Sequence, residues 1–378
     1  MILINKPWIG EDEKREVINA LDDNSLTSAA KDGGKRVREL ESLLQDYLNV
    51  KNVVSINSGT SALLAALLAA DVKTGDEVLL PSFTFVATAN SILAAGARPV
   101  FVDVNKYDYT IDVSDLKAKI TKKTRAIVPV HLYGHPSDMD EIAEVAETRS
   151  ISIIEDACQS LGSTYNSRQT GTFGIMGCFS FYASKVLTSG EGGAVVTNDD
   201  SIAEKLKMIR NHGMVEGYDT RILGLNLRLP EIGAAIAKTQ MIRLREMLGL
   251  RRRNAEMLTT LISDVANDNG MILPSESQSK RFNWYLYTIA LTRDNLRDKI
   301  QKMMLNDKIG ATVYYDPPVH RTPYYERIMA SGTGSQRSSV MGLPNTDWAS
   351  KHVLSLPIHP LVTPEGLERV ANSLKGAI

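Results

Sequence analysis

The sequence has few cysteines, almost no net charge and no long hydrophobic run. Its 378 residues include only Cys158 and Cys178, each in an apolar strand-like segment, so we expect packed thiols and neither a disulfide nor a metal site. A formal net charge of -1 gives no excess of Lys and Arg for nucleic acid or an anionic membrane. No apolar run reaches the ~18 residues of a membrane span, and the apolar part of the N-terminal segment is too short for a signal peptide. We therefore predict a soluble, cytoplasmic protein.

Apolar runs of strand length recur along the first half of the chain, separated by helical patterns. Apolar residues make up 43% of the sequence and charged residues 23%, so the chain can form one large domain and a smaller one. The alternation predicts an α/β fold with a mostly parallel sheet of about seven strands, covered by helices on both faces. The predicted strands are Val53–Ile56, Glu77–Pro81, Pro99–Val104, Ala126–His131, Ser152–Glu155, Cys178–Phe181 and Ala194–Thr197.

Longer helical patterns follow in the second half of the chain. Patterns over Pro230–Met247 and Arg251–Ile262 predict two helices, with a domain linker near Gly249. A Gly- and Ser-rich segment at residues 331–339 predicts a loop. The predicted domains are a large domain over residues 1–248 and a smaller C-terminal α+β domain over residues 249–378.

One lysine, Lys185, lies in a polar turn between an apolar strand and a glycine-rich stretch. The segment Phe179–Gly193 reads FSFYASKVLTSGEGG. Lysine is usually a solvated surface charge. A carbonyl cofactor, in contrast, needs an amine that is held in a fixed place and partly desolvated, so that the amine can form a Schiff base. The position of Lys185 favours this second role.

A carboxylate, Asp156, ends another short apolar run upstream. The segment Ile151–Ser160 reads ISIIEDACQS, and a carboxylate at the C-terminal end of such a strand can pair with the protonated pyridine nitrogen of pyridoxal 5'-phosphate, PLP. Together with Lys185, this residue suggests a PLP enzyme.

A turn suited to phosphate follows the first predicted strand. The segment Val53–Leu63 passes through Gly59 into a helix whose first residues are small and hydroxylated. Free N–H groups at the helix start, the helix dipole and a hydroxyl of Thr60 or Ser61 would attract an anion. An ordinary helix cap accounts for this segment as well. It is not a Walker loop, because the Gly-Lys-Ser/Thr ending is missing.

Five segments, in this order and spacing, resemble the DegT/DnrJ/StrS family of PLP-dependent sugar aminotransferases. The resemblance covers nearly the whole chain and implies the fold-type I PLP transferase fold of aspartate aminotransferase. The matching segments are Asn57–Leu63, Pro81–Thr88, Glu155–Gln159, Ser180–Lys185 with Gly190–Gly193, and Arg210–Gly213.

The resemblance implies a role for each residue at the cofactor phosphate and ring. Gly59 and Thr60 would hold the phosphate through backbone and hydroxyl, and Ser180 would add a second hydroxyl. Phe85 would stack on the pyridine ring, and Gln159 would contact the ring hydroxyl.

The resemblance also implies the catalytic pair. Asp156 would pair with the pyridine N–H and keep the ring an electron sink. Lys185 would bond to the cofactor and, after displacement by the substrate amine, move the proton between substrate carbon and cofactor carbon.

Two C-terminal segments resemble family segments that contact the partner subunit and the sugar. Gly224–Glu231 resembles a stretch whose Asn, here Asn226, reaches the cofactor phosphate of the partner, which implies a homodimer with shared active sites. Val313–His320 resembles a segment near the sugar nucleotide, which implies substrate contacts for Tyr315 and His320. In this chain Asp316 replaces a usual proline there.

The implied reaction moves an amino group from an amino acid, with L-glutamate as the expected donor, to a keto-deoxysugar nucleotide. It would serve amino-sugar biosynthesis for a surface polysaccharide or a secondary metabolite. A sugar dehydratase of the family is an alternative, but its lysine is replaced by histidine, so Lys185 argues against it. An aromatic amino acid synthase of the family retains the lysine and stays open. A non-catalytic regulatory relative is a third alternative, although it would not be expected to keep Asp156, Gln159 and Lys185.

Overall fold

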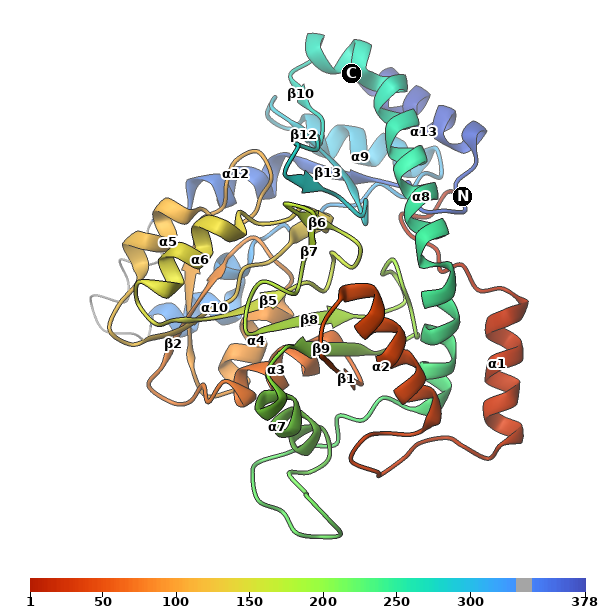
Figure 1. Cartoon of the computed structure of the whole chain (residues 1–378). Helices are drawn as coiled ribbons and strands as arrows, with labels where there is room; N and C mark the ends of the chain where they lie inside the picture. The colour runs from red at the N-terminus through yellow and green to blue at the C-terminus, as the bar shows by residue number, and fades with distance from the viewer. Residues whose placement is uncertain (331–341) are drawn as a thin grey trace.

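A seven-stranded sheet forms the centre of the computed structural model, which describes residues 1–330 and 342–378 (Figure 1). Its strand order is β1-β9-β8-β5-β4-β2-β3, and β9 alone runs antiparallel to its neighbours. The predicted mostly parallel sheet of about seven strands is thereby confirmed. The predicted loop at residues 331–339 lies outside the described residues. The strands are β1 (Asn52–Ile56), β2 (Glu77–Pro81), β3 (Arg98–Val102), β4 (Thr124–Ile127), β5 (Ser152–Asp156), β8 (Met176–Ser180) and β9 (Gly193–Thr197).

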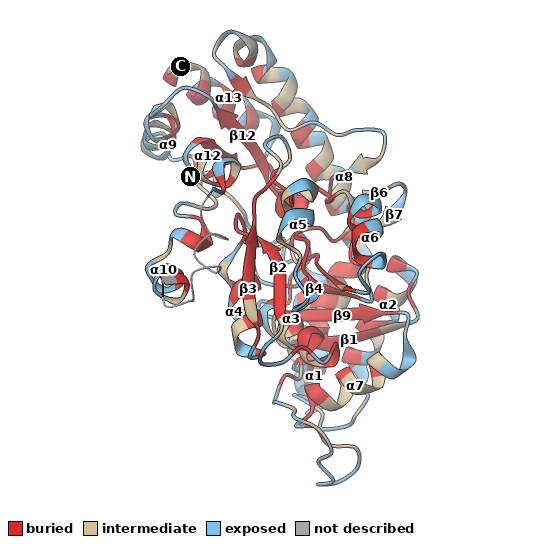
Figure 2. Ribbon diagram, turned by 90° about the vertical axis from the view of Figure 1, so that its left-hand side faces the viewer, coloured by how far each residue is buried: buried red, intermediate tan, exposed pale blue. Residues whose placement is uncertain are grey.

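Successive strand residues point to opposite faces of this sheet, and helices bury both faces (Figure 2). In β2, Val78 and Leu80 belong to one apolar cluster and Leu79 to another on the opposite face. The first face is covered by α3 (Gly59–Ala69), α4 (Val86–Ala94) and α7 (Asp200–Arg210). The opposite face is covered by α2 (Lys35–Leu48), α5 (Val113–Lys119), α6 (Met139–Glu147) and the first half of α8.

The long helix α8 (Glu231–Asp268) joins the large sheet to the C-terminal part of the molecule (Figure 1). The sequence predicts two helices that separate near Gly249, but the structure has one continuous helix of 38 residues. A glycine inside a helix costs only about 1 kcal/mol relative to alanine. Packing of both ends of α8 outweighs this cost, because the N-terminal half packs on the large sheet and the C-terminal half on a second core.

The C-terminal part contains an antiparallel sheet of three strands, β10 (Met271–Ile272), β12 (Tyr287–Leu291) and β13 (Val353–Leu356). Its core lies between this sheet, α8, α9 (Leu296–Asn306) and α13 (Pro364–Ala377). Ile2 forms a bridge with Ile309, so the N-terminus lies against this part as well (Figure 1).

The remaining described elements belong to neither of these two sheets. They are α1 (Glu11–Asp22), α10 (Pro323–Ala330), α12 (Pro344–His352), the short helices η1 (Leu132–Gly134) and η2 (Val319–Arg321), and a small sheet of β6 (Thr164–Tyr165), β7 (Arg168–Gln169) and β11 (Lys280–Arg281). Among the described residues, no helix has the length and apolar character needed to cross a membrane.

Candidate active site

A cavity of about 620 Å³ opens where the carboxyl ends of β5 and β8 meet the amino ends of α3 and α4. This is the edge at which open α/β sheets bind ligands. Eight of the ten predicted site residues line this cavity, and these are Gly59, Thr60, Phe85, Asp156, Gln159, Ser180, Lys185 and Tyr315.

One corner of the cavity is built by the close approach of α3 to the end of β8. Ser58 caps α3, because its Oγ accepts a hydrogen bond of 3.1 Å from the backbone N–H of Ser61. A Cβ on Gly59 would lie 2.7 Å from Ser180 Cβ and 3.0 Å from Cys158 Sγ, so only glycine fits here. This corner is lined by the start of helix α3 and by the hydroxyls of Thr60 and Ser180. The N–H groups of a helix start and hydroxyl donors suit a phosphate.

Asp156 is buried at the end of β5 and is held by two neutral donors. The Thr88 hydroxyl donates to Asp156 Oδ2 at 2.8 Å, and the backbone N–H of Cys158 donates to Oδ1 at 3.2 Å. Within the described ranges, no Lys, Arg or His side chain forms an ion pair with Asp156. A buried carboxylate without a cationic partner fits the protonated ring nitrogen of PLP.

Thr88 is a site residue that the sequence analysis missed. It lies on α4, 68 positions before Asp156. Thr88 ends the matching segment Pro81–Thr88, but no role was assigned to it, because a hydroxyl at an apolar helix position commonly bonds to the backbone of its own helix.

Lys185 faces an aromatic ring from the C-terminal part. Its Nζ lies 4.6 Å from the ring centroid of Tyr285, and the hydroxyl of Tyr285 lies 3.1 Å from Ser184 Oγ. The backbone N–H of Lys185 donates to the carbonyl of Tyr182 at 2.9 Å and closes the predicted turn. Tyr285 was not predicted as a site residue, because it lies in Trp284–Leu291, an apolar run typical of a core strand.

Gln159 and Tyr315 form one hydrogen-bonded wall. Gln159 Oε1 accepts from the backbone N–H of Tyr133 at 2.9 Å, and Gln159 Nε2 donates to the Tyr315 hydroxyl at 3.2 Å. Burial raises the pKa of Tyr315 well above its usual value, so this phenol stays neutral. The ring of Phe85, which is 54% exposed, lies 6.1 Å from that of Tyr315 and is accessible for stacking.

Asn226 lies outside this cavity. It lines a neighbouring cavity of about 540 Å³ together with Asn57 and Arg228, and Glu191 lines both cavities. Asn57 Nδ2 donates to the backbone carbonyl of Asn226 at 3.3 Å.

His320 also lies outside the main cavity and is buried. Its Nδ1 lies 2.7 Å from Ser82 Oγ, and burial lowers the pKa of His320 to about 4. The neighbouring Asp316 is paired with Arg297 at 2.9 Å and with Lys351 at 2.8 Å, so its carboxylate joins α9 and α12. This geometry is typical of structural contacts.

Both cysteines are free thiols, as the sequence predicts. Burial raises the pKa of each well above the usual value. Cys158 lines the main cavity beside the predicted phosphate corner, and Cys178 is buried in β8.

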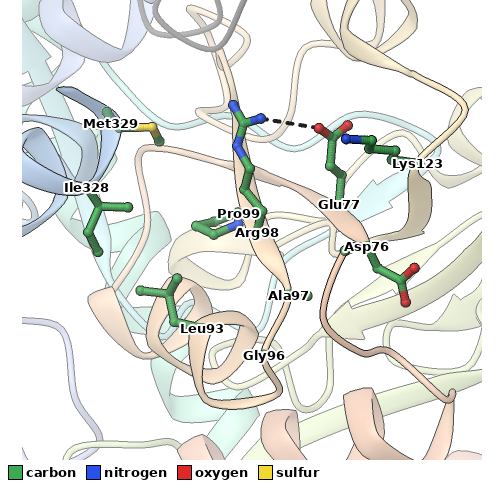
Figure 3. Close-up of a pocket in the computed structure, with 11 residues that line it drawn as sticks. Asp76, Glu77, Leu93, Gly96, Ala97, Arg98, Pro99, Lys123, Ile328 and Met329 are labelled. Carbon is green, nitrogen blue, oxygen red and sulfur yellow. Dashed lines mark hydrogen bonds and ion pairs between the residues drawn. The ribbon is translucent and has the colours of Figure 1, made fainter. Parts of the chain in front are cut away.

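A separate cavity of about 390 Å³ lies at the amino ends of β2 and β3 (Figure 3). Arg98 and Glu77 point toward each other across it at 3.3 Å, and Leu93 and Met329 line its apolar side. It contains none of the predicted site residues, and it lies at the end of the sheet opposite to the candidate site.

The chain is similar in sequence to curated proteins along almost its whole length. A GDP-perosamine synthase of Caulobacter vibrioides is 33% identical over 99% of this chain and 97% of its own length. A pleiotropic regulatory protein of Geobacillus stearothermophilus is 36% identical over 96% of this chain and 95% of its own length.

Solved structures share the fold and confirm the predicted fold-type I PLP transferase fold. The S. venezuelae DesV structure, in complex with a ketimine intermediate, has a TM-score of 0.88 and 33% identity, and the match covers 97% of this chain and 94% of DesV. The model of the DegT/DnrJ/EryC1/StrS aminotransferase family matches residues 7–375. The protein is therefore a member of the DegT/DnrJ/EryC1/StrS aminotransferase family.

Proposed function

We propose that this chain is a PLP-dependent aminotransferase that moves an amino group from an amino acid, with L-glutamate as the expected donor, to the keto group of a nucleotide-linked deoxysugar. The observation that carries the proposal is the cavity that brings Lys185 and Asp156 together beside the Gly59 and Ser180 corner. The family and the perosamine synthase relative support the sugar substrate.

Each proposed role follows from the chemistry of the side chain. When bound, PLP withdraws electrons from the bonds of the substrate carbon attached to the amine. Asp156 would hold the proton on the ring nitrogen, because a buried carboxylate gains from a cationic partner. Lys185 would anchor the cofactor and then carry the proton between two carbons, since an amine can act as both acid and base.

The phosphate and the ring would be held by other lining residues. The helix start at Gly59 and the hydroxyls of Thr60 and Ser180 would bind the phosphate. Phe85 would stack on the ring, and Gln159 would bond to the ring hydroxyl. A contact between Tyr315 and the sugar is supported, because Tyr315 lines the cavity. A contact between His320 and the sugar is not supported, because His320 is buried outside the cavity.

We further propose that the working unit is a homodimer and that Asn226 completes the phosphate site of the partner. The support is that Asn226 lines a cavity adjacent to, and separate from, the one that contains Lys185. The proposed domains remain residues 1–248 and 249–378, with α8 as the continuous connection.

A regulatory function is the second candidate, favoured by the name of the Geobacillus relative. A lysine and a buried carboxylate that face one cavity favour catalysis, since a purely regulatory chain has no need of either. The family synthase of aromatic amino acids differs from the proposed enzyme in substrate, so the same assay separates the two.

The test is a panel of 3-keto and 4-keto nucleotide sugars, each incubated with PLP, L-glutamate and purified protein, with mass detection of the amino sugar. We expect one or a few substrates to gain an amino group. The Lys185→Ala variant should lose both the visible absorbance of the lysine-bound cofactor and the product, and the exposed-lysine control Lys122→Ala should keep both. A Lys185→Ala protein that retained both would contradict the proposal.

A further inference from the structure

Tyr285 contacts the lysine segment at two points. The Lys185 Nζ lies 4.6 Å from the centroid of the Tyr285 ring, which is the geometry of a cation–π interaction. The Tyr285 hydroxyl lies 3.1 Å from the hydroxyl of Ser184, the residue before the lysine. One side chain therefore contacts both the amine and the backbone segment that carries it.

The backbone of Tyr285 is fixed by buried polar side chains. Its N–H donates to Asn283 Oδ1 at 2.9 Å, and its carbonyl accepts from Arg251 Nη1 at 3.1 Å. The Asn283 side chain in turn donates to the carbonyl of Gln159 at 2.9 Å. Tyr285, Asn283 and Arg251 are all buried, and Tyr285 is 6% exposed. The ring is thus presented rigidly to the cavity.

We propose that Tyr285 is a positioning residue for Lys185. Its ring face holds the lysine ammonium whenever the amine is not bonded to the cofactor, and its hydroxyl holds Ser184 so that the amine returns to the same place. The effect of this contact on catalysis rests on the proposed function. The contact between Tyr285 and Lys185 itself is present in the chain without cofactor. A long lysine side chain has many rotamers, and an attractive ring face selects those that stay inside the cavity.

Four variants separate the contribution of the ring from that of the hydroxyl. Tyr285→Phe keeps the ring and loses the hydroxyl, and Ser184→Ala removes the partner of that hydroxyl. Tyr285→Leu removes the ring and keeps an apolar side chain in the core to which Tyr285 belongs. Tyr285→Met is a second variant without a ring, and its flexible side chain fills irregular space.

The experiment measures the reactivity of Lys185 in the protein without PLP. A trace amount of an acetylating reagent is added, and mass spectrometry compares the modification rate of Lys185 with that of the exposed Lys122 in the same sample. Loss of the ring should raise the relative rate at Lys185 by about 3- to 10-fold, because the attraction that holds the ammonium is removed. The Tyr285→Phe rate should stay within about 2-fold of wild type, since the ring remains.

Equal relative rates in wild type and in a folded ringless variant would overturn the inference. So would a Tyr285→Phe rate as high as that of Tyr285→Leu, because the hydroxyl would then hold the amine. Melting temperatures identify a misfolded variant, and the Met variant replaces the Leu variant if only the latter unfolds. Because this assay contains no cofactor, its result is independent of the sugar panel: an active transaminase with unchanged Lys185 reactivity rejects the role of Tyr285 alone.

Discussion

At the scale of single residues, the candidate site depends on a buried carboxylate, Asp156, that has no cationic partner among the described residues. Asp156 accepts hydrogen bonds from two neutral donors, the Thr88 hydroxyl and the Cys158 N–H. Neutral donors compensate part of the cost of burying a carboxylate, and a cation would compensate more. The charge of Asp156, more than its shape, should therefore matter for the reaction.

We expect Asp156→Asn to fold and to bind PLP, but to lose turnover by about 100-fold or more, because the amide cannot stabilise a protonated ring nitrogen. The Thr88→Val variant keeps the carboxylate and loses one donor, so a smaller loss of about 10-fold is expected. Steady-state rates and melting temperatures measured on the same preparations check both effects. Wild-type turnover in Asp156→Asn would reject the pairing with the ring nitrogen.

Buried histidines should make the fold sensitive to acid. Burial lowers the pKa of His135, His320 and His359 from 6.5 to about 4. As the pH falls below about 6.5, the unfolded chain binds protons at these histidines, whereas the folded chain does not bind them until about pH 4. The folded state therefore loses stability as the pH falls from about 6.5 to about 4. Each such histidine contributes a slope of up to about 1.4 kcal/mol per pH unit.

The prediction is tested with His359→Asn, whose side-chain oxygen can still accept the hydrogen bond that His359 Nδ1 receives from the N–H of Leu361. Urea unfolding measures the free energy of unfolding at pH 7 and at pH 5. The loss between these two pH values should be smaller in His359→Asn than in wild type by about 1 to 2 kcal/mol. The exposed His212→Asn serves as the control. Identical pH dependence in wild type and His359→Asn would contradict the assignment.

At the scale of secondary structure elements, the site exists because helix starts and strand ends meet. Helix α3 begins at Gly59, three residues after β1 ends at Ile56, and its first turn touches the end of β8 at Ser180. The cap at Ser58 is a local interaction. The contact with Ser180 is a tertiary interaction, and it makes the glycine necessary.

We expect Gly59→Ala to weaken PLP binding by about 10-fold or more, since the new Cβ would push the start of α3 away from Ser180 and Cys158. The matched control is Gly249→Ala in α8, where a Cβ would have no neighbour within 4 Å. That control should bind PLP as wild type does and be more stable by about 0.5 to 1 kcal/mol. Cofactor titration by absorbance checks the pair, and equal affinity in the two variants would exclude the proposed phosphate corner.

At the scale of the whole molecule, the positions of Asn226 and Lys185 bear on assembly. The two residues line different cavities, and Glu191 lines both. If a partner subunit brings its Asn226 to the site of Lys185, each active site needs two chains.

Mixing Lys185→Ala with Asn226→Ala under conditions of subunit exchange should raise activity above the sum of the parents, because one of the two sites in each heterodimer is then intact. Mixing Lys185→Ala with Asp156→Asn is the control, since both defects belong to residues of the same cavity and no site is restored. Sedimentation and subunit exchange are measured in parallel. An active monomer, or exchange without a gain in the first mixture, would reject the shared site.

The layered α/β architecture, the approximate positions of the seven strands and most of the lining of the site could be predicted from the sequence. The strand ends were less accurate, because β4 ends at Ile127 and not at the predicted His131. Hydrophobic periodicity and turn chemistry act within a few residues, so Gly59, Asp156 and Lys185 could be assigned to the ends of strands and the start of a helix. The five segments of the resemblance were equally local.

Contacts between distant segments depend on the tertiary structure. Tyr285 lies 101 positions from Ser184, so no local pattern connects it to the lysine turn. The continuity of α8 through Gly249 and the burial of His320 behind Ser82 depend on packing against other elements, which outweighs local preference. Side chains that meet across the fold are selected by shape and burial, and a single sequence does not display either.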